Sequence, residues 1–227
     1  MTATDNVEAT WDAIAESFDK TRRKPWPRVL DVIATFSPSD VVVDVGCGNG
    51  RHILPCIEKC NTLIGIDVAQ NMLTYTQKKI NHAKNVTLIH ASAVKVPIAS
   101  DSVDTVLFIA AVHNIQGKQN RLEALHEVKR ILKPGGSALV SVWSRWQDRF
   151  RLHFLREVLR FYKGDFGDID VLWNRDGLDI FRYYHLYSRR ELCHDLHAVG
   201  FKINRIYAET ISSKRHPDNY FALVYKK

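Results

Sequence analysis

The sequence predicts an α/β fold, a doubly wound and mostly parallel sheet with one antiparallel strand near its C-terminal edge. Three observations lead to this prediction. Apolar, strand-like segments alternate with segments of helical periodicity from residue 41 onward. The first of these strand-like segments, 41–45, runs directly into a glycine-rich turn. The last two, near 201–208 and 219–226, have no helix between them and predict a terminal hairpin.

Each predicted helix has apolar residues three or four positions apart, and each predicted strand is a short β-branched or alternating run. In chain order we expect helices over 5–20 and 27–36, a strand over 41–45, a helix over 51–60, a strand over 62–66, a helix over 69–82, strands over 86–90 and 103–110, a helix over 118–132, a strand over 137–143, a helix over 188–198 and strands near 201–208 and 219–226.

Three local signals mark helix ends. The Lys-Pro-Gly-Gly sequence at 133–136 should stop the helix before it, because proline cannot continue a helix and glycine favours its C-terminal turn. Ser188 and Glu191 have the spacing of a capping box and should open the next helix. Gly200 should end that helix.

Composition predicts one domain over residues 1–227. The chain has 227 residues, of which 45% are hydrophobic, and this is enough for one substantial core. Within it we expect 1–36 to form a helical lid and 144–187 to form an insertion on the substrate side. The formal net charge of +7 suits a polyanionic partner such as RNA.

The cysteine pattern indicates a reduced, cytoplasmic protein. The four cysteines form no C-x-x-C pair. The first residues lack the basic and apolar regions of a signal peptide, and no stretch has the length of a membrane span. Cys193, His194 and His197 resemble metal ligands in type, but they lie on one amphipathic helix without companion ligands, so we expect no metal on this chain.

The glycine-rich turn predicts a cofactor site. Gly46, Gly48 and Gly50 alternate after a buried strand, and glycine is needed where the backbone turns with positive φ or a ligand approaches it closely. Asp44 precedes them, and Asp67 ends the next strand, where a carboxylate can accept both hydroxyls of an adenosine ribose. This arrangement resembles motif I of class I, Rossmann-like S-adenosylmethionine methyltransferases and differs from the G-x-G-x-x-G form of dehydrogenases.

The resemblance implies S-adenosylmethionine as cofactor, with S-adenosylhomocysteine as product. It implies that Asp67 binds ribose and that Met72 packs on adenine. Ser92 stands where relatives usually have an aspartate for the adenine amino group, so we expect ordinary rather than tight affinity. The cofactor-binding residues implied in this way are Asp44, Gly46, Cys47, Gly48, Gly50, Asp67, Val68, Met72, Ser92, Ala93 and Ala110.

Three segments outside the common fold point to a particular family. They are T-R-R-K-P-W-P at 21–27, I-A-A-V-H-N at 109–114 and R-Y-Y-H-L-Y at 182–187. Together they resemble the tRNA wobble-uridine methyltransferases, which esterify 5-carboxymethyluridine at the first anticodon position and include the methyltransferase portion of the human AlkB-type tRNA enzyme. Relatives tend to have two consecutive histidines where this chain has His113 and Asn114, so a role for a second imidazole is in question.

The chemistry implied by this resemblance needs cations rather than a base. A carboxylate has a free pKa of about 4 and is ionised at neutral pH, so it only has to be oriented toward the methyl group. Arg22, His113 and Arg182 are the expected catalytic residues. The expected substrate-binding residues, which should contact the anticodon loop of tRNA, are Lys24, Trp26, Asn114, Arg145, Tyr183, Tyr184 and His185.

Each of these assignments has a structural alternative. Arg22 also fits a solvated basic loop, and His113 also fits a buried structural histidine. Trp26, between two prolines, either fills the core or stacks on a base. An alternating strand with one buried face explains the tyrosines after Arg182 equally well. Six basic residues are expected either to contact phosphates or to form a solvated helix face. They are Arg145, Arg149, Arg151, Arg156, Arg160 and Lys163.

The resemblance also implies a partner. Relatives work with a small zinc-binding activator protein, and the predicted strand 86–90 becomes an uncharged edge strand that another chain can extend. We therefore expect a heterodimer, with zinc on the partner. Two further functions stay open: methylation of a small molecule, which leaves the basic segments unexplained, and a non-catalytic subunit that binds the cofactor or RNA.

Overall fold

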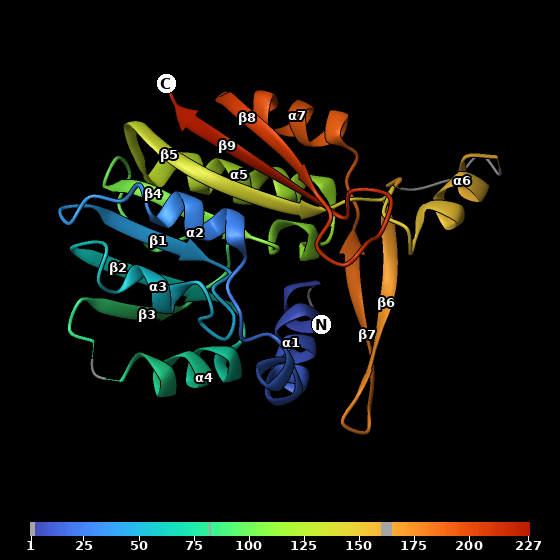
Figure 1. Ribbon diagram of the computed structural model, residues 1–227, viewed down its shortest axis with the longest axis horizontal. Helices are drawn as coiled ribbons and strands as arrows, with labels where there is room; N and C mark the ends of the chain where they lie inside the picture. The colour runs from blue at the N-terminus through green and yellow to red at the C-terminus, as the bar shows by residue number, and fades with distance from the viewer. Residues whose placement is uncertain (1–2, 82, 160–164) are drawn as a thin grey trace.

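A seven-stranded sheet forms the centre of the molecule. The computed structural model describes residues 3–81, 83–159 and 165–227. The strands follow the order β3-β2-β1-β4-β5-β9-β8, and only β9 runs antiparallel to its neighbours (Figure 1). The strands of this sheet are β1 (Val41–Val45), β2 (Thr62–Asp67), β3 (Val86–His90), β4 (Val103–Ile109), β5 (Leu132–Trp143), β8 (Phe201–Glu209) and β9 (Asn219–Lys226). The predicted fold class is therefore confirmed.

Helices cover both faces of the sheet because its strands are apolar on both sides. On one face the buried side chains of α5 and α7 pack against the sheet, and on the other face those of α2, α3 and α4 do so. The helices are α1 (Ala3–Thr21), α2 (Pro27–Ile33), α3 (Ile53–Cys56), α4 (Gln70–Ile80), α5 (Lys118–Ile131), α6 (Arg151–Leu159) and α7 (Arg189–Ala198), with a 3-10 turn, η1, at Val112–Asn114. No helix in the described ranges is long and apolar enough to cross a membrane.

Two expected boundaries are wrong. The helix predicted over 51–60 is reduced to the four residues of α3, with turns on both sides; Pro55 within it has no N–H to donate. The Lys-Pro-Gly-Gly sequence does not separate α5 from the next strand, because β5 begins at Leu132 and runs through it. Gly135 has a φ of +79°, and the pairing with β4 shifts register between Val103 and Thr105, so the strand bulges rather than breaks.

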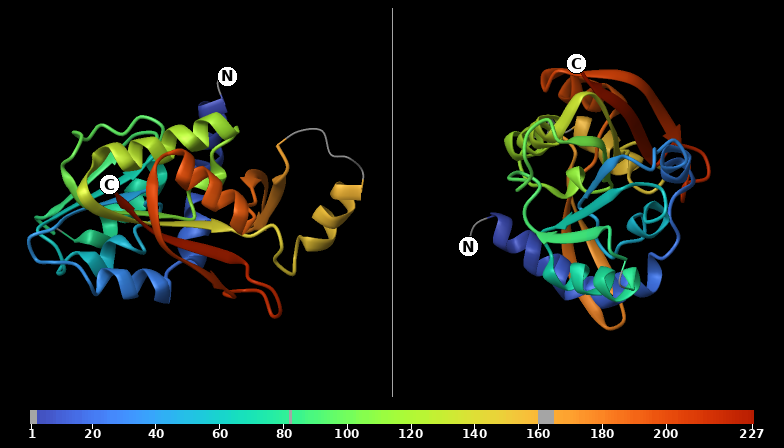
Figure 2. Two further views of the ribbon diagram at one scale, coloured as in Figure 1. Left: turned by 90° about the horizontal axis from the view of Figure 1, so that it is seen from above. Right: turned by 90° about the vertical axis from the view of Figure 1, so that its left-hand side faces the viewer.

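The sequence left the segment between β5 and α7 without assigned elements, and the structure shows a helix and a hairpin there. After α6, β6 (Asp168–Arg175) and β7 (Leu178–His185) pair antiparallel as a separate two-stranded sheet. The hairpin projects beyond the end of the main sheet, with α6 further out (Figure 2). It docks on the N-terminal helix α1, where Trp173 donates a hydrogen bond from Nε1 to Ser17 at 3.1 Å.

The helix predicted over 188–198 agrees with α7, whereas the helix predicted over 27–36 ends earlier, at Ile33. Ser188 caps α7 through a complete capping box with Glu191, as its spacing predicts.

The parallel strands β1, β2 and β4 end at the same edge of the sheet, facing α1 and the β6–β7 hairpin (Figure 1). A space is thereby enclosed between the sheet, the helix and the hairpin, at the edge where α/β sheets bind ligands.

Candidate active site

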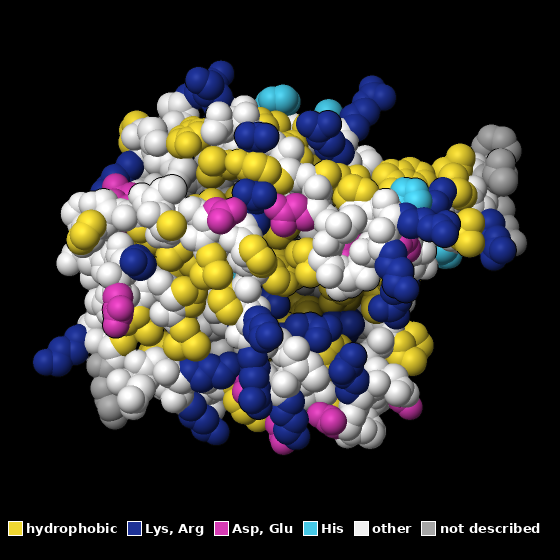
Figure 3. All heavy atoms as spheres, viewed as in Figure 1, with side chains coloured by type: hydrophobic (Ala, Val, Ile, Leu, Met, Phe, Trp, Pro, Cys, Tyr) yellow, Lys and Arg dark blue, Asp and Glu magenta, His cyan; other side chains and the backbone are white. Residues whose placement is uncertain are grey.

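A pocket of about 1310 Å³ lies at this edge of the sheet. Figure 3 shows it as a hollow in the viewed face, with Lys and Arg side chains around its rim. Its walls come from α1 and the segment after it, the glycine-rich turn, the ends of β2 and β4, η1, and the hairpin. Because single small ligands usually occupy about 300–1,000 Å³, this pocket has room for a cofactor together with part of a second molecule.

The glycine-rich turn needs glycine because of its backbone conformation and, at Gly46, because a side chain would collide with Ala111. Gly46 has a φ of +70°, and a Cβ on it would lie 2.4 Å from Cβ of Ala111. Gly48 has a φ of +54°, and its nearest neighbour to an added Cβ is a Phe18 ring atom at 4.0 Å. Gly46 and Gly48 line the pocket. The exposed backbone at this turn therefore forms a cradle that a ligand can approach closely.

Asp67 holds the turn against the end of β2. One carboxylate oxygen accepts the N–H of Gly48 at 2.7 Å, and the other accepts the N–H of Ala69 at 2.9 Å. Burial raises the pKa of Asp67 to about 6, although the two N–H donors oppose the shift. Each oxygen keeps a lone pair, so the ionised carboxylate can also accept the two hydroxyls of a ribose.

Asp44 lies behind the turn with an unsatisfied oxygen. It is 1% exposed, and its Oδ2 has no hydrogen-bond partner among the described residues. Burial, with the charge of Asp67 added, raises the pKa of Asp44 to about 8. A buried acceptor without a partner is unusual in a folded protein, and it is satisfied when a ligand or water donates to it. These features fit S-adenosylmethionine, although no ligand is present.

Most of the predicted cofactor residues share this part of the pocket wall. Asp44 and Gly50 are not among the lining residues; Gly50 packs against Thr76, whose hydroxyl donates to the Gly48 carbonyl at 2.8 Å. Ala110 has a φ of +54°, a conformation that a non-glycine residue seldom adopts. The predicted cofactor residues that line the pocket are Gly46, Cys47, Gly48, Asp67, Val68, Met72, Ser92, Ala93 and Ala110.

Across the pocket, Arg182 of β7 is buried without an acidic partner in the described part of the chain. It is 6% exposed; its guanidinium lies 4.7 Å from the ring centre of Trp173 and 5.6 Å from that of Trp11. It donates a hydrogen bond to Oη of Tyr184 at 2.7 Å, whereas its Nε has no partner among the described residues. Burial lowers the pKa of Arg182, but the group stays charged at neutral pH. A cation in this setting favours an anionic ligand.

Arg22 lies at the end of α1 and faces the same space. Its guanidinium lies 5.7 Å from the ring centre of Trp173, and its carbonyl accepts a hydrogen bond from Asn49 at 2.9 Å. Burial lowers the pKa of Arg22, and nearby Arg175 lowers it further. Arg22 is half-buried on the pocket wall, so the alternative of a solvated loop does not describe it.

His113 is a buried, neutral imidazole on the pocket wall. It is 1% exposed and stacks on Tyr184 at a ring distance of 5.3 Å. Its Nδ1 accepts the backbone N–H of Trp143 at 3.1 Å. Burial lowers the pKa of His113 to about 3, and the charges of His185 and Arg182 contribute. At neutral pH the ring proton therefore sits on Nε2, which makes the side chain a hydrogen-bond donor rather than a base.

Four predicted substrate residues also line the pocket: Lys24, Trp26, Asn114 and Tyr184. Trp26 is half-buried and meets Phe221 edge to face at 5.6 Å. Its ring face is covered by the guanidinium of Arg51 at 4.6 Å. The sequence reasoning missed Arg51, although its position directly after Gly50 was a signal for it.

The charges on the pocket wall are strongly one-sided. Among the described residues, three acids and nine cations line it. The carboxylates of Asp67, Asp148 and Asp218 all accept backbone N–H groups nearby. The cations are Lys20, Arg22, Arg23, Lys24, Arg51, Arg149, Arg175, Arg182 and Lys214. The acids therefore organise loops, and the cations other than Lys20, which pairs with Glu16 at 2.8 Å, remain to attract an anion.

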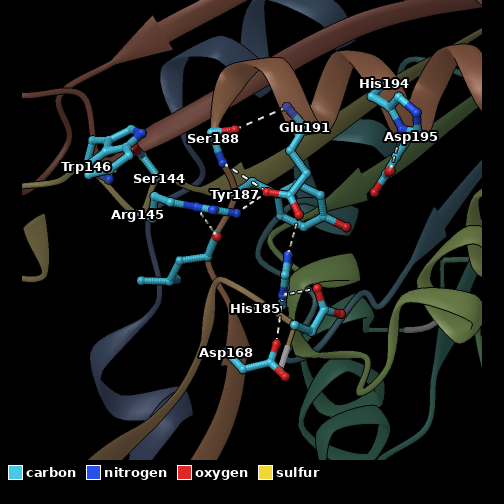
Figure 4. Close-up of polar contacts among 12 residues, drawn as sticks. Ser144, Arg145, Trp146, Asp168, His185, Tyr187, Ser188, Glu191, His194 and Asp195 are labelled. Carbon is cyan, nitrogen blue, oxygen red and sulfur yellow. Dashed lines mark hydrogen bonds and ion pairs between the residues drawn. The ribbon is translucent and has the colours of Figure 1, made fainter. Parts of the chain in front are cut away.

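The other three predicted substrate residues, Arg145, Tyr183 and His185, are not among the residues that line the pocket; Figure 4 shows Arg145 and His185 in a polar network with Asp168 and Glu191. His185 is fully buried, with Nδ1 2.7 Å from Asp168 and Nε2 2.8 Å from Glu191. Tyr183 donates a hydrogen bond to Asp168 at 2.6 Å, and Arg145 pairs with Glu191. This network supports the hairpin, and a direct role in substrate binding stays a prediction for these three residues.

Asp165, His185 and Glu191 also have the spacing of metal ligands, with potential ligand atoms within 4.8 Å of one another. Arg121 pairs with Asp165, and Arg145 pairs with Glu191, so built-in cations already balance these acids. The absence of a metal from this chain stays a prediction. The cluster at Cys193–His197 lies on α7, where Asp195 is buried and His194 is exposed.

Of the predicted phosphate contacts, Arg149 is exposed at the rim of the pocket and Arg156 is exposed on α6. Arg151 is half-buried at the start of α6. Arg160 and Lys163 lie outside the described residues.

Comparison with known proteins defines the class. A family model described as "Methyltransferase domain" matches residues 43–140. A solved S-adenosylmethionine-dependent methyltransferase from Methanosarcina mazei superimposes with a TM-score of 0.72 at 18% identity, over 89% of this chain and 98% of that one. A chain of the solved complex between the Haloferax volcanii Trm112 methyltransferase activator and a putative methyltransferase also has a TM-score of 0.72, at 16% identity over 96% of each chain. The fold and the glycine-rich site are those of S-adenosylmethionine-dependent methyltransferases.

Two relatives show the family within this class. The tRNA (carboxymethyluridine(34)-5-O)-methyltransferase of Schizosaccharomyces pombe is 30% identical over 87% of this chain and 89% of its own length. The mouse protein with the same activity name is 34% identical over 63% of this chain, but that match spans only 20% of the mouse protein. The chain belongs to the tRNA carboxymethyluridine methyltransferase family, and its cofactor is S-adenosylmethionine.

Proposed function

We propose that this protein transfers the methyl group of S-adenosylmethionine to the carboxylate of 5-carboxymethyluridine at the wobble position of tRNA. The observation that carries the proposal is Arg182, a buried guanidinium in the pocket with no acidic partner among the described residues and with a free Nε. An isolated buried charge is costly, and the site becomes favourable when an anionic substrate pairs with it.

The pocket supplies orientation rather than proton abstraction. S-adenosylmethionine, held by Asp67 and the glycine-rich turn, would supply an electrophilic methyl group, and a carboxylate oxygen would take this methyl group while the S–C bonding electrons would remain on sulfur. A carboxylate already has the lone pair for this displacement. Arg182 and Arg22 orient the acceptor, and the Nε2–H of neutral His113 offers a further hydrogen bond.

A base-catalysed methylation fits the pocket less well. His113 has a lowered pKa of about 3 and already uses Nδ1 to accept a backbone N–H. Asp148 and Asp218 line the pocket, which the sequence did not predict, yet both carboxylates are engaged with backbone N–H groups of residues 211–216. These two acids are therefore poor candidates for removing a proton from a substrate.

The surplus of cations at the rim favours RNA over a small molecule. A small carboxylic acid could satisfy Arg182 alone, but it would leave Lys24, Arg149 and Lys214 at the rim without partners. A tRNA anticodon loop brings phosphates to these positions when one base enters the pocket. The intact cofactor cradle likewise favours an enzyme over a non-catalytic subunit.

A partner subunit belongs to the same proposal. β3 is at the edge of the sheet and carries no Asp, Glu, Lys or Arg. We propose that a small zinc-binding activator extends the sheet at this edge. The Haloferax volcanii complex between the Trm112 methyltransferase activator and a putative methyltransferase supports a partner of this kind. The cytoplasmic location of the protein stays a prediction.

The chemical nature of the product tests the function. The chain and its activator should transfer labelled methyl from S-adenosylmethionine to tRNA bearing 5-carboxymethyluridine, and mild alkali should release the label because a methyl ester hydrolyses readily. The matched control is tRNA bearing 5-carbamoylmethyluridine, whose neutral amide should accept no label. Label that survives alkali, or that enters the amide control equally, would overturn the assignment.

A further inference from the structure

A second, smaller hollow adjoins the pocket at its rim. It measures about 420 Å³ and is lined by Asp148, Arg151, Leu152, Lys214 and Arg215. Asp148 and Lys214 also line the large pocket, so the two spaces are adjacent. Three of its five lining residues are Lys or Arg, which makes it a basic notch beside the opening.

Carboxylates fold the loop 210–218 that forms one wall of this notch. Asp148 accepts the backbone N–H groups of Lys214 at 2.8 Å and Arg215 at 2.9 Å. Asp218 accepts those of Ile211 at 2.8 Å and Ser213 at 2.8 Å. The loop is thus pinned at both ends by its backbone, and its basic side chains are not needed to hold it.

The Asp148 carboxylate accepts hydrogen bonds from the loop backbone, and its Oδ1 lies 2.8 Å from Nδ1 of His216. These donors hold the pKa of Asp148 well below its usual range, so the group is a fixed anion that the loop itself compensates. Lys214 and Arg215 are exposed, and neither pairs with a carboxylate among the described residues. Arg151 contacts the His216 ring at 3.1 Å. The notch therefore has unpaired positive charge at its surface.

We propose that this notch binds phosphodiester groups of the RNA strand next to the nucleotide in the pocket. The inference rests on the proposed function. When a base of a polymer enters the pocket, its neighbouring phosphates must stay outside, and the notch lies next to the pocket, with Asp148 and Lys214 shared between the two. Open basic surfaces contact phosphates by charge and counterion release, without reading bases. Residues 148–152 and 211–216 thereby set the path of the backbone.

The test is the salt dependence of RNA binding by the full chain. We compare the double variant Lys214→Gln/Arg215→Gln with the parent, using an unmodified anticodon stem–loop RNA. Removing two phosphate contacts should lower the slope of log affinity against log salt by about 2. The matched control is Lys59→Gln/Lys202→Gln, which removes the same charge from two exposed residues. They lie just before β2 and at the start of β8, at the end of the strands away from the pocket. Its slope should equal that of the parent.

The outcomes separate this inference from the proposed function. If the parent binds RNA and the Lys214/Arg215 variant has the parent's slope, the notch does not bind phosphate although the proposed function stands. If both double variants lower the slope equally, binding depends on total charge and the notch is overturned as a site. If the parent binds no RNA but methylates a free carboxylic acid, the proposed function fails first. S-adenosylmethionine affinity, measured by calorimetry, should be unchanged and shows that the variant is folded.

Discussion

At the scale of single residues, burial decides the chemical state of the groups around the pocket. His113 is neutral because it is buried near Arg182, and its pKa falls to about 3. Burial raises the pKa of Asp67 to about 6 and that of Asp44 to about 8. The same residue types on the surface would be a titrating base and two ordinary anions. At neutral pH His113 is therefore an uncharged hydrogen-bond donor, and Asp44 keeps its proton more readily than Asp67 does.

Replacing Arg182 separates the acceptor side from the cofactor side. Arg182→Ala should lower kcat/KM for tRNA about thirtyfold, because a charge-assisted hydrogen bond contributes roughly 2 kcal/mol. S-adenosylmethionine affinity, measured by calorimetry, should stay within about twofold of the parent, since the cofactor cradle lies across the pocket. Arg182→Lys keeps the charge without the planar guanidinium, so its kcat/KM should lie between those of the parent and Arg182→Ala. Loss of cofactor binding in Arg182→Ala would contradict the assignment.

Asp44 should make the ligand-free protein less stable as the pH rises. Its pKa is about 8 in the folded protein and about 4 in an unfolded chain. Between these values the folded state binds the extra proton, so the free energy of unfolding declines as the pH rises from about 4 to 8.

Asp44→Asn removes this contribution; the raised pKa of Asp67 and the lowered pKa of His113 act in opposite directions and only below about pH 6.5, so the variant should show no decline from these groups between pH 6.5 and 8. Urea unfolding at a series of pH values measures it. A variant whose decline between pH 6 and 8 is as steep as the parent's would rule out Asp44 as its source.

At the scale of elements, one buried arginine joins the pieces that carry the acceptor side. Arg121 of α5 is fully buried and donates hydrogen bonds to Oη of Tyr187 and Oη of Tyr183, each at 3.2 Å. It also reaches the carbonyl of Ile115, directly after η1, and pairs with Asp165. The 3-10 turn with His113 and the strand with Arg182 are thereby held to the same helix.

Arg121→Met should lower the free energy of unfolding by about 3 kcal/mol, the low end for a broken buried pair because Asp165 keeps partial contact with water. Urea unfolding measures this loss. The variant should also raise KM for tRNA more than the dissociation constant of S-adenosylmethionine, since the cofactor turn does not contact Arg121. Arg121→Lys, which can still pair with Asp165, should lose less. A loss below 1 kcal/mol in Arg121→Met would show that the tyrosine and carbonyl contacts are not needed.

The elements were predictable to different degrees. The strands β1, β2 and β4 and the capped helix α7 follow from short local patterns, because their burial and their caps depend on nearby residues. The β6–β7 hairpin was missed except for the alternation after Arg182. Its inner face is buried by α1, more than 150 positions away in the chain, so neither strand has a complete local signature.

At the scale of the whole molecule, the pocket and the adjacent basic notch are separate from the edge strand β3. The pocket, seen as a hollow in Figure 3, is lined by residues of the sheet and of the hairpin, and the notch shares Asp148 and Lys214 with it. β3 is the outermost strand on the side away from β8. An activator on this edge would leave the substrate side open.

Hydrogen exchange locates the activator. When the zinc-binding partner is added, backbone amides of 86–90 should exchange more slowly, because added strand pairing protects them. Amides of the opposite edge strand, 201–209, provide the internal control and should not change. Protection confined to β8, or to the hairpin, would place the partner elsewhere.

By itself the sequence determined the fold class, the cofactor and the family of this protein. Those features depend on contiguous motifs: a β-branched strand before Gly46, an acid at the end of the next strand, and short strings such as the one around Trp26. Only the tertiary structure decided which groups face the substrate space. It placed Arg182 in an aromatic enclosure with Trp11 and Trp173, and it turned Tyr183 and His185 away from the pocket. The physical reason is that burial, charge pairing and side-chain direction at the hairpin depend on elements far apart in the chain, which meet only when it folds.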